Sequence, residues 1–178
     1  MLKLYDLTIE YKHEPLGLDE VQPRFGWKLD SDQQDTVQTS YRLKVMQNGS
    51  IVWDSGTVSS AQSILNEYLG PNLAPRTAYT WTVTVTDNHG DTAEAASRFE
   101  TGLLDGGAFE GKAKWITSAF DKDSPVSPVL YKEFAVTGTV QKARLYATAL
   151  GMYEAELNGE PVDLSLIHIS EPTRLGMI

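Results

Sequence analysis

The sequence predicts an all-β protein whose first part is an antiparallel sandwich. Residues 79–86 alternate large apolar residues with threonine, which is the period of two expected for a half-buried strand. Asn48-Gly49 stands between two apolar runs, and this pair favours a tight hairpin. Turn residues recur between short apolar segments, and no long amphipathic helix pattern interrupts them. Together these features are typical of a two-sheet sandwich.

The strands of the first module follow from the same patterns. The alternation predicts a strand over 79–86 whose Tyr79, Trp81, Val83 and Val85 face the core. Residues 41–53 are predicted to form a hairpin about the Asn-Gly turn. Further strands are expected at 4–9, 25–29 and 97–100. Turns are expected at 15–17, 54–56, 70–71, 74–75 and 88–90.

A second β module is predicted after a linker. Residues 102–112 carry four glycines in eleven positions, so they divide a first domain, 1–101, from a second one, 113–163. The second domain has predicted strands at 115–116, 130–136, 142–149 and 153–157, closed by a turn at Asn158-Gly159. Four strands are too few for two sheets to bury each other, so the sequence predicts an incomplete second sandwich.

Composition and charge exclude several classes of protein. The 178 residues include 15 basic and 24 acidic side chains, a net charge of −9, which disfavours nucleic acid and anionic membrane surfaces as partners. No apolar stretch has the length of a transmembrane helix, and the N-terminus has no secretory signal pattern. Cysteine is absent, which excludes disulfides and thiolate chemistry. We therefore expect a soluble, cytoplasmic protein.

Candidate catalytic and metal-binding residues are few. Glycoside hydrolysis needs two carboxylates about 5–9.5 Å apart, but the pairs Asp30/Asp32 and Asp121/Asp123 lie in polar stretches and are expected to be solvated surface charge. Residues 30–35 lack the central glycine of an EF-hand loop, which leaves open only a calcium site of another kind.

Histidine, serine and glycine patterns add no site. No second histidine or cysteine stands at ligand spacing from His13 or His89, and His168 lies in the tail 164–178, so a zinc site is not expected. A serine-hydrolase elbow is absent, and the glycine-rich linker lacks the Gly-Lys-Ser/Thr of a phosphate loop. The sequence therefore predicts no catalytic residue, no metal ligand and no cofactor.

Tryptophan could serve either packing or sugar stacking. Trp27, Trp53 and Trp81 alternate with polar neighbours on predicted strands, so we expect them in the core. Trp115 stands at the module boundary, where packing between modules and sugar stacking both remain open, and Tyr153 is equally ambiguous.

An ordered series of local motifs resembles the N-terminal region of bacterial α-L-rhamnosidases. The resemblance covers residues 4–163 and implies a fibronectin-III-like domain followed by the start of the β-sandwich that precedes an (α/α)6 catalytic barrel. The matching stretches are 14–19 (EPLGLD), 23–29 (PRFGWKL), 52–56 (VWDSG), 76–83 (RTAYTWTV), 99–104 (FETGLL), 113–116 (AKWI), 130–134 (LYKEF), 143–146 (ARLY) and 157–159 (LNG).

The resemblance implies a function for the parent protein and a limit for this chain. Family members hydrolyse terminal α-L-rhamnosyl bonds with inversion, and their acid and base carboxylates lie in the barrel, to which no position here corresponds. The chain is then a non-catalytic scaffold, inactive alone, that meets rhamnose-containing glycosides only through the parent enzyme. The alternatives are a free-standing carbohydrate-binding or adhesion module, and a structural spacer that binds no sugar.

The end of the chain departs from the family pattern. Residues 164–174 (LSLIHISEPTR) look like the translation of a transposase-type sequencing adapter. This resemblance predicts that 164–178 are an artefact and that the second module is truncated. The other interpretation is a genuine strand at 166–169 followed by a tail stopped by proline.

Overall fold

The computed structural model describes residues 1–104, 113–118, 128–150 and 153–162. The chain divides into two units, Met1–Lys114 and Trp115–Ile178. The described residues form strands and no helices. These strands are β1 (Lys3–Ile9), β2 (Leu16–Leu18), β3 (Arg24–Asp30), β4 (Gln38–Gln47), β5 (Ser50–Asp54), β6 (Val58–Ser59), β7 (Asn66–Glu67), β8 (Ala78–Asp87), β9 (Thr92–Thr101), β10 (Glu156–Leu157) and β11 (Glu160–Pro161).

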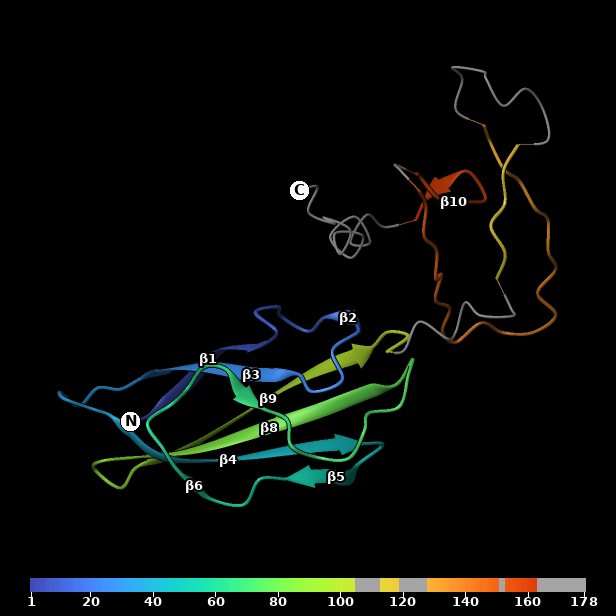
Figure 1. Ribbon diagram of the computed structural model, residues 1–178. Coiled ribbons are helices and arrows are strands. Elements are labelled where there is room, and N and C mark those ends of the chain that lie inside the picture. Colours follow the sequence, from blue (N-terminus) through green and yellow to red (C-terminus); the bar gives the residue numbers. More distant parts are fainter. Residues whose placement is uncertain (105–112, 119–127, 151–152, 163–178) are drawn as a thin grey trace, which may run out of the picture. The chain divides into compact units, whose positions relative to one another are not determined.

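Two sheets make up the first unit. The smaller has the order β1-β3-β7, and the larger has the order β2-β9-β8-β4-β5 with β6 also paired to β4 (Figure 1). Phe25 from β3 contacts the Trp81 ring from β8, with ring centroids 4.8 Å apart, so side chains of both sheets meet in one core. The predicted all-β sandwich is therefore confirmed.

Strand β8 shows why the alternating pattern was informative. Its Tyr79, Trp81, Val83 and Val85 are at most 3% exposed, as predicted. The threonines between them face the opposite side, because successive side chains of a strand point to opposite faces. Since β8 is paired with both β4 and β9, it lies in the middle of the larger sheet.

The predicted hairpin is also confirmed. β4 and β5 pair antiparallel, and the turn between them consists of Asn48 and Gly49. Both turn residues have positive φ, 49° and 81°, as the favoured two-residue hairpin turn requires.

Several short elements differ from the prediction. Residues 15–17 were expected as a turn, but β2 begins at Leu16 and runs parallel to the end of β9. β9 starts five residues before the expected segment 97–100, since it pairs along most of β8. β6 and β7, at two residues each, are too short to produce a period of two.

The second unit contains one strand pair among its described residues. β10 and β11 flank Asn158-Gly159, which confirms the predicted turn. The strands predicted at 115–116, 130–136 and 142–149 are wrong: these residues form no strand, and only Glu156–Leu157 of the segment 153–157 does so. A strand needs a hydrogen-bonded partner, and apolar alternation without one does not produce a ladder.

Candidate functional site

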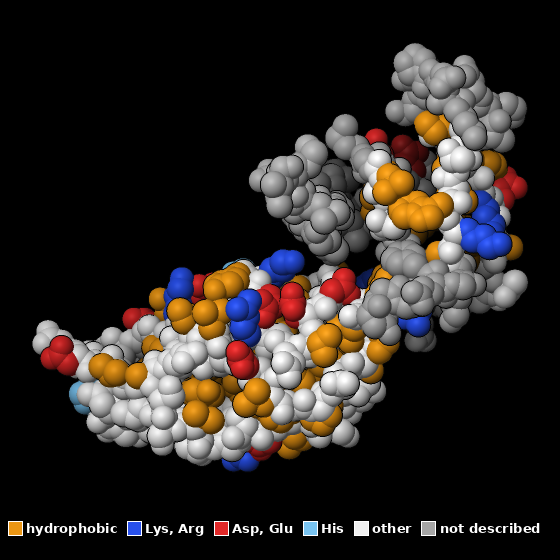
Figure 2. Space-filling model, viewed as in Figure 1, with side chains coloured by type: hydrophobic (Ala, Val, Ile, Leu, Met, Phe, Trp, Pro, Cys, Tyr) orange, Lys and Arg blue, Asp and Glu red, His pale blue; other side chains and the backbone are white. Residues whose placement is uncertain are grey.

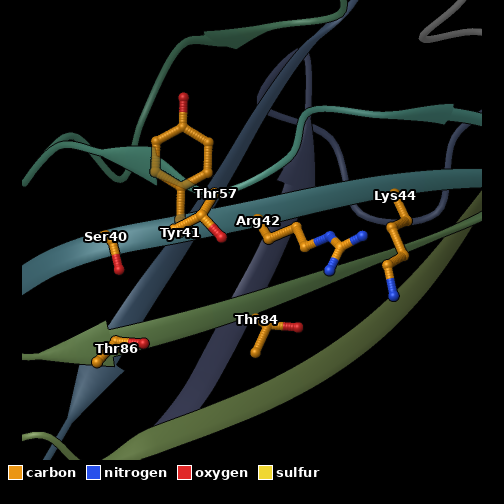
Figure 3. Close-up of a pocket in the computed structure, with 7 residues that line it drawn as sticks. All are labelled: Ser40, Tyr41, Arg42, Lys44, Thr57, Thr84 and Thr86. Atoms are coloured by element: carbon orange, nitrogen blue, oxygen red, sulfur yellow. The ribbon is translucent and has the colours of Figure 1, made fainter.

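A shallow groove of about 210 Å³ lies on the outer face of the larger sheet (Figure 3). It is formed where β4, β8 and the residue preceding β6 lie together. Hydroxyl groups and two cationic side chains dominate its lining. The lining residues are Ser40, Tyr41, Arg42, Lys44, Thr57, Thr84 and Thr86.

Several polar side chains that line this groove are already bonded to neighbouring residues. The Arg42 guanidinium binds Asp54 in a bidentate pair, with N–O distances of 2.8 and 2.5 Å. The Thr84 hydroxyl donates to a Glu94 carboxylate oxygen at 2.8 Å. Figure 3 shows the Tyr41 ring on the side of β4 away from Ser40, and that ring contacts the buried Trp27. The groove thus resembles an ordinary solvated sheet face.

Asp54, which binds the groove-lining Arg42, is a carboxyl group that stays ionised. The Arg42 guanidinium and the Gly56 N–H, together with the charges of Arg42 and Lys44, lower the pKa of Asp54 to about 2. A general acid in glycoside hydrolysis needs a raised pKa. Asp54 is therefore unsuited to donate a proton to a leaving group near neutral pH.

The first carboxylate pair considered from sequence lies at the surface. Asp30 ends β3 and is exposed, and Asp32 is 70% exposed and pairs with the N-terminal amine of Met1. They behave as solvated charge, as predicted. Asp121 and Asp123 lie outside the described residues.

Two of the three histidines lie in polar surface contacts. The His13 ring has its nitrogens 3.2 Å from the Leu7 carbonyl and 3.2 Å from the Asp6 carboxylate. His89 Nε2 lies 3.2 Å from the Gln34 carbonyl. Within the described ranges, no group of three or more His, Asp or Glu side chains is placed to hold a metal ion. His168 lies outside those ranges.

The tryptophans of the first unit pack inward. Trp27 and Trp81 are 1% and 0% exposed, and the partly buried Trp53 packs edge-on against Tyr68 with ring centroids 5.0 Å apart. The predicted core role is confirmed for all three. In the second unit Trp115 is 69% exposed, whereas Tyr153 is half-buried.

One side chain with a specific role was missed by the sequence analysis. The Asp19 carboxylate accepts hydrogen bonds from the backbone N–H groups of Leu103 and Leu104, 84 and 85 residues away. The two segments belong to the motifs 14–19 and 99–104, but nothing in the sequence indicates that they touch.

Among the residues described, no helix has the length and apolar character to cross a membrane.

Two family models match this chain. A model described as the Rha78A-like N-terminal immunoglobulin domain matches residues 4–105, and one described as the alpha-L-rhamnosidase N-terminal domain matches 138–168. The second match includes the first five residues of the segment predicted to be an adapter artefact, and that prediction stays untested. Immunoglobulin and fibronectin-III domains share the two-sheet architecture seen here.

Similar proteins are α-L-rhamnosidases. The enzyme of Streptomyces avermitilis is 40% identical over 124 residues, which are 66% of this chain and 12% of that protein. The enzyme of Alteromonas sp. is 31% identical over 166 residues, 83% of this chain and 18% of that protein. The chain therefore spans less than a fifth of the length of these relatives.

Solved structures agree with this result. The α-L-rhamnosidase of Streptomyces avermitilis, solved with L-rhamnose, has a TM-score of 0.56 at 39% identity, covering 58% of this chain and 11% of that chain. The enzyme of Dictyoglumus thermophilum has a TM-score of 0.53 at 32% identity, covering 57% and 12%. Since the immunoglobulin-domain model matches more than half of the residues, this chain belongs to the family of Rha78A-like N-terminal immunoglobulin domains, which form the N-terminal region of α-L-rhamnosidases.

Proposed function

We propose that this chain is the non-catalytic N-terminal scaffold of an α-L-rhamnosidase. The observation that carries the proposal is the match of both family models to N-terminal domains. The chemistry of the described residues supports it, because the one groove described above is lined by hydroxyl groups and cations and contains no pair of carboxylates. A sheet face with this lining suits a supporting role.

The reaction of the parent protein follows from its relatives. We propose that it hydrolyses terminal α-L-rhamnosyl bonds, because the curated relatives are α-L-rhamnosidases. Inversion is the stereochemical outcome that the family resemblance implies. Inversion requires an acid and a base about 6.5–9.5 Å apart across the scissile bond. Those two groups would belong to a part of the enzyme other than the domains matched here.

The first test is an activity assay of the chain itself. Purified protein is incubated with 4-nitrophenyl α-L-rhamnopyranoside, beside a mock purification from cells that lack the gene. We expect no nitrophenol release above the mock sample. Release above that level, lost when Trp81→Ala unfolds the first unit, would contradict the non-catalytic assignment.

A domain exchange tests the scaffold role directly. In the Streptomyces avermitilis relative, the matching N-terminal domain is deleted or replaced by residues 4–105 of this chain. We expect deletion to lower Tm and kcat, and the graft to restore both in large part. A matched graft carrying Trp81→Ala, which removes a core side chain, should not restore them. An enzyme indifferent to the deletion would refute the scaffold role.

Carbohydrate binding is the second candidate function, favoured by one observation. Trp115, Tyr131 and Phe134 of the second unit are 69%, 78% and 67% exposed, and exposed aromatic faces can stack on sugar rings. Titration with L-rhamnose, followed by tryptophan fluorescence, distinguishes this function from the scaffold. Saturable quenching lost in Trp115→Ala but kept in Trp53→Phe would support binding, whereas no response up to high sugar concentration would support the scaffold.

A further inference from the structure

Two distant stretches of the first unit meet where its last strand ends. β2 runs parallel to the end of β9, with Leu16 opposite Glu100 and Leu18 opposite Thr101. The Glu100 N–H donates to the Pro15 carbonyl at 2.9 Å, and the Gly102 N–H donates to the Leu18 carbonyl at 2.8 Å. The backbone of the final strand is therefore bound along one side by residues 15–18.

The pairing continues past the strand through a side chain. One carboxylate oxygen of Asp19 accepts from Leu103 N–H at 2.7 Å and from Leu104 N–H at 3.0 Å. Successive N–H groups that converge on one anion form a compact anion-binding concavity. Leu104 has φ = 58°, a backbone conformation that leucine keeps only where its surroundings hold it.

Gly102 makes this close approach possible. A Cβ at this position would lie 2.2 Å from the Asp19 carboxylate oxygen and 2.9 Å from the Gly17 carbonyl oxygen, so no side chain fits. On the other side of the segment, the Gly102 carbonyl accepts from Arg76 N–H at 2.8 Å.

Thr101 strengthens that second side. Its hydroxyl donates to the Ala74 carbonyl at 2.7 Å and accepts from Thr77 N–H at 2.9 Å. Residues 100–104 are thus bound from both sides, by 15–19 and by 74–77. Leu104 also packs against the hydrophobic core.

We propose that Asp19 is a positioning residue whose bonds to Leu103 and Leu104, beside Gly102, form an exit latch that holds the backbone of residues 102–104 in one conformation just after β9 ends. The inference goes beyond the proposed function and does not depend on it. It also gives a physical reason for two of the motifs, 14–19 and 99–104: each supplies one half of the latch.

Amide hydrogen exchange in the full chain tests the latch. In Asp19→Ala, exchange at Leu103 and Leu104 should rise at least about tenfold, because local opening replaces bonding to a fixed acceptor. Exchange at the Val83 amide in β8, and Tm, should stay close to wild type. Glu20→Ala removes the neighbouring carboxylate and is the matched control, with no change expected at either leucine.

Two further variants keep the proposal falsifiable if Asp19→Ala is poorly folded. Asp19→Asn keeps an oxygen acceptor without the charge and should give intermediate exchange at Leu103 and Leu104. Gly102→Ala keeps the Asp19 residue, but the added Cβ displaces the Asp19 carboxylate. Exchange at the Leu103 and Leu104 amides should therefore rise. Unchanged exchange at Leu103 and Leu104 in folded Asp19→Ala or Gly102→Ala would overturn the latch, and so would an equal rise across β8.

Discussion

Gln38 shows at the scale of one residue how the first unit tolerates a buried polar group. Its side chain is 4% exposed. Its carbonyl oxygen accepts from Trp27 Nε1 at 2.9 Å, and its amide nitrogen donates to the carbonyls of Ser60 and Gln62, each at 2.9 Å. The side chain therefore ties β3 to the loop between β6 and β7, because each buried polar atom finds its partner there.

Replacing this glutamine should be costly. Gln38→Met keeps most of the volume but leaves Trp27 Nε1 unpaired in the interior and removes the donor to two partly buried carbonyls, which should lower the free energy of unfolding by about 2–4 kcal/mol. Urea titration of the chain measures the change. Gln47→Met, at the far end of β4 and only half-buried, is the control and should change it little. Equal effects of the two substitutions would argue against the buried network.

The Arg42–Asp54 pair should make stability depend on pH at the acid end. Bonding to Arg42 and to the Gly56 N–H lowers the pKa of Asp54 from an ordinary 3.8 to about 2 in the folded chain. A carboxyl group whose pKa is lower in the folded chain contributes its full stabilisation at pH values above its unfolded-state pKa. This stabilisation is lost as the pH falls through the folded-state pKa. The stability difference between wild type and Asp54→Asn should therefore shrink between about pH 4 and pH 2.

Urea midpoints at pH 7, 4 and 2 give this difference. Asp30→Asn removes an exposed carboxylate at the end of β3 and is the matched control. A difference for Asp54→Asn that stays constant across these pH values would show that the ion pair does not set the shift.

At the scale of elements, the hairpin turn between β4 and β5 contributes to the stability of the first unit. Both residues of the β4–β5 turn have positive φ, and that of Gly49 is 81°. A Cβ added at Gly49 would have no other atom within 4 Å. Any cost of a side chain there comes from the backbone alone.

Gly49→Ala should lower the free energy of unfolding by about 1–2 kcal/mol, because L-residues resist the left-handed region. Ser50→Ala, one position later at the start of β5, should have almost no effect. Thermal melts of both variants provide the measurement. A Gly49→Ala variant as stable as Ser50→Ala would mean that the turn adjusts its conformation.

At the scale of the whole molecule, the two units differ in how far their apolar side chains are buried. Every buried hydrophobic side chain that the structure describes lies within residues 2–99. In the second unit most of the described large apolar residues are exposed, and Figure 2 shows hydrophobic side chains at its surface. They are Trp115, Ile116, Val129, Leu130, Tyr131, Phe134, Val136, Val140, Leu145, Leu150 and Leu157.

Exposed apolar surface of this extent favours association. We expect the full chain to self-associate in light scattering at concentrations where residues 1–104 stay monomeric, since residues 1–104 contain the whole described hydrophobic core of the first unit. Tyr131→Lys with Phe134→Lys in the full chain should reduce association. Identical monomeric behaviour of both chains would show that the second unit buries these side chains by itself.

The sequence by itself determined the elements whose signals are local. The alternation over 79–86 predicts β8 and its buried face, and Asn48-Gly49 predicts the hairpin, because side-chain period and turn chemistry act between near neighbours. The inward packing of Trp81 follows from the same alternation.

Only the tertiary structure decided which distant segments meet. β2 overlaps residues for which the sequence predicts a turn, because the backbone at the end of β9 pairs with them. Asp19 finds its partners 84 and 85 residues away, a distance that no local pattern encodes. For the same reason the segments 130–136 and 142–149 alternate like strands yet form none: a ladder depends on a partner, and the pattern of one segment does not supply it.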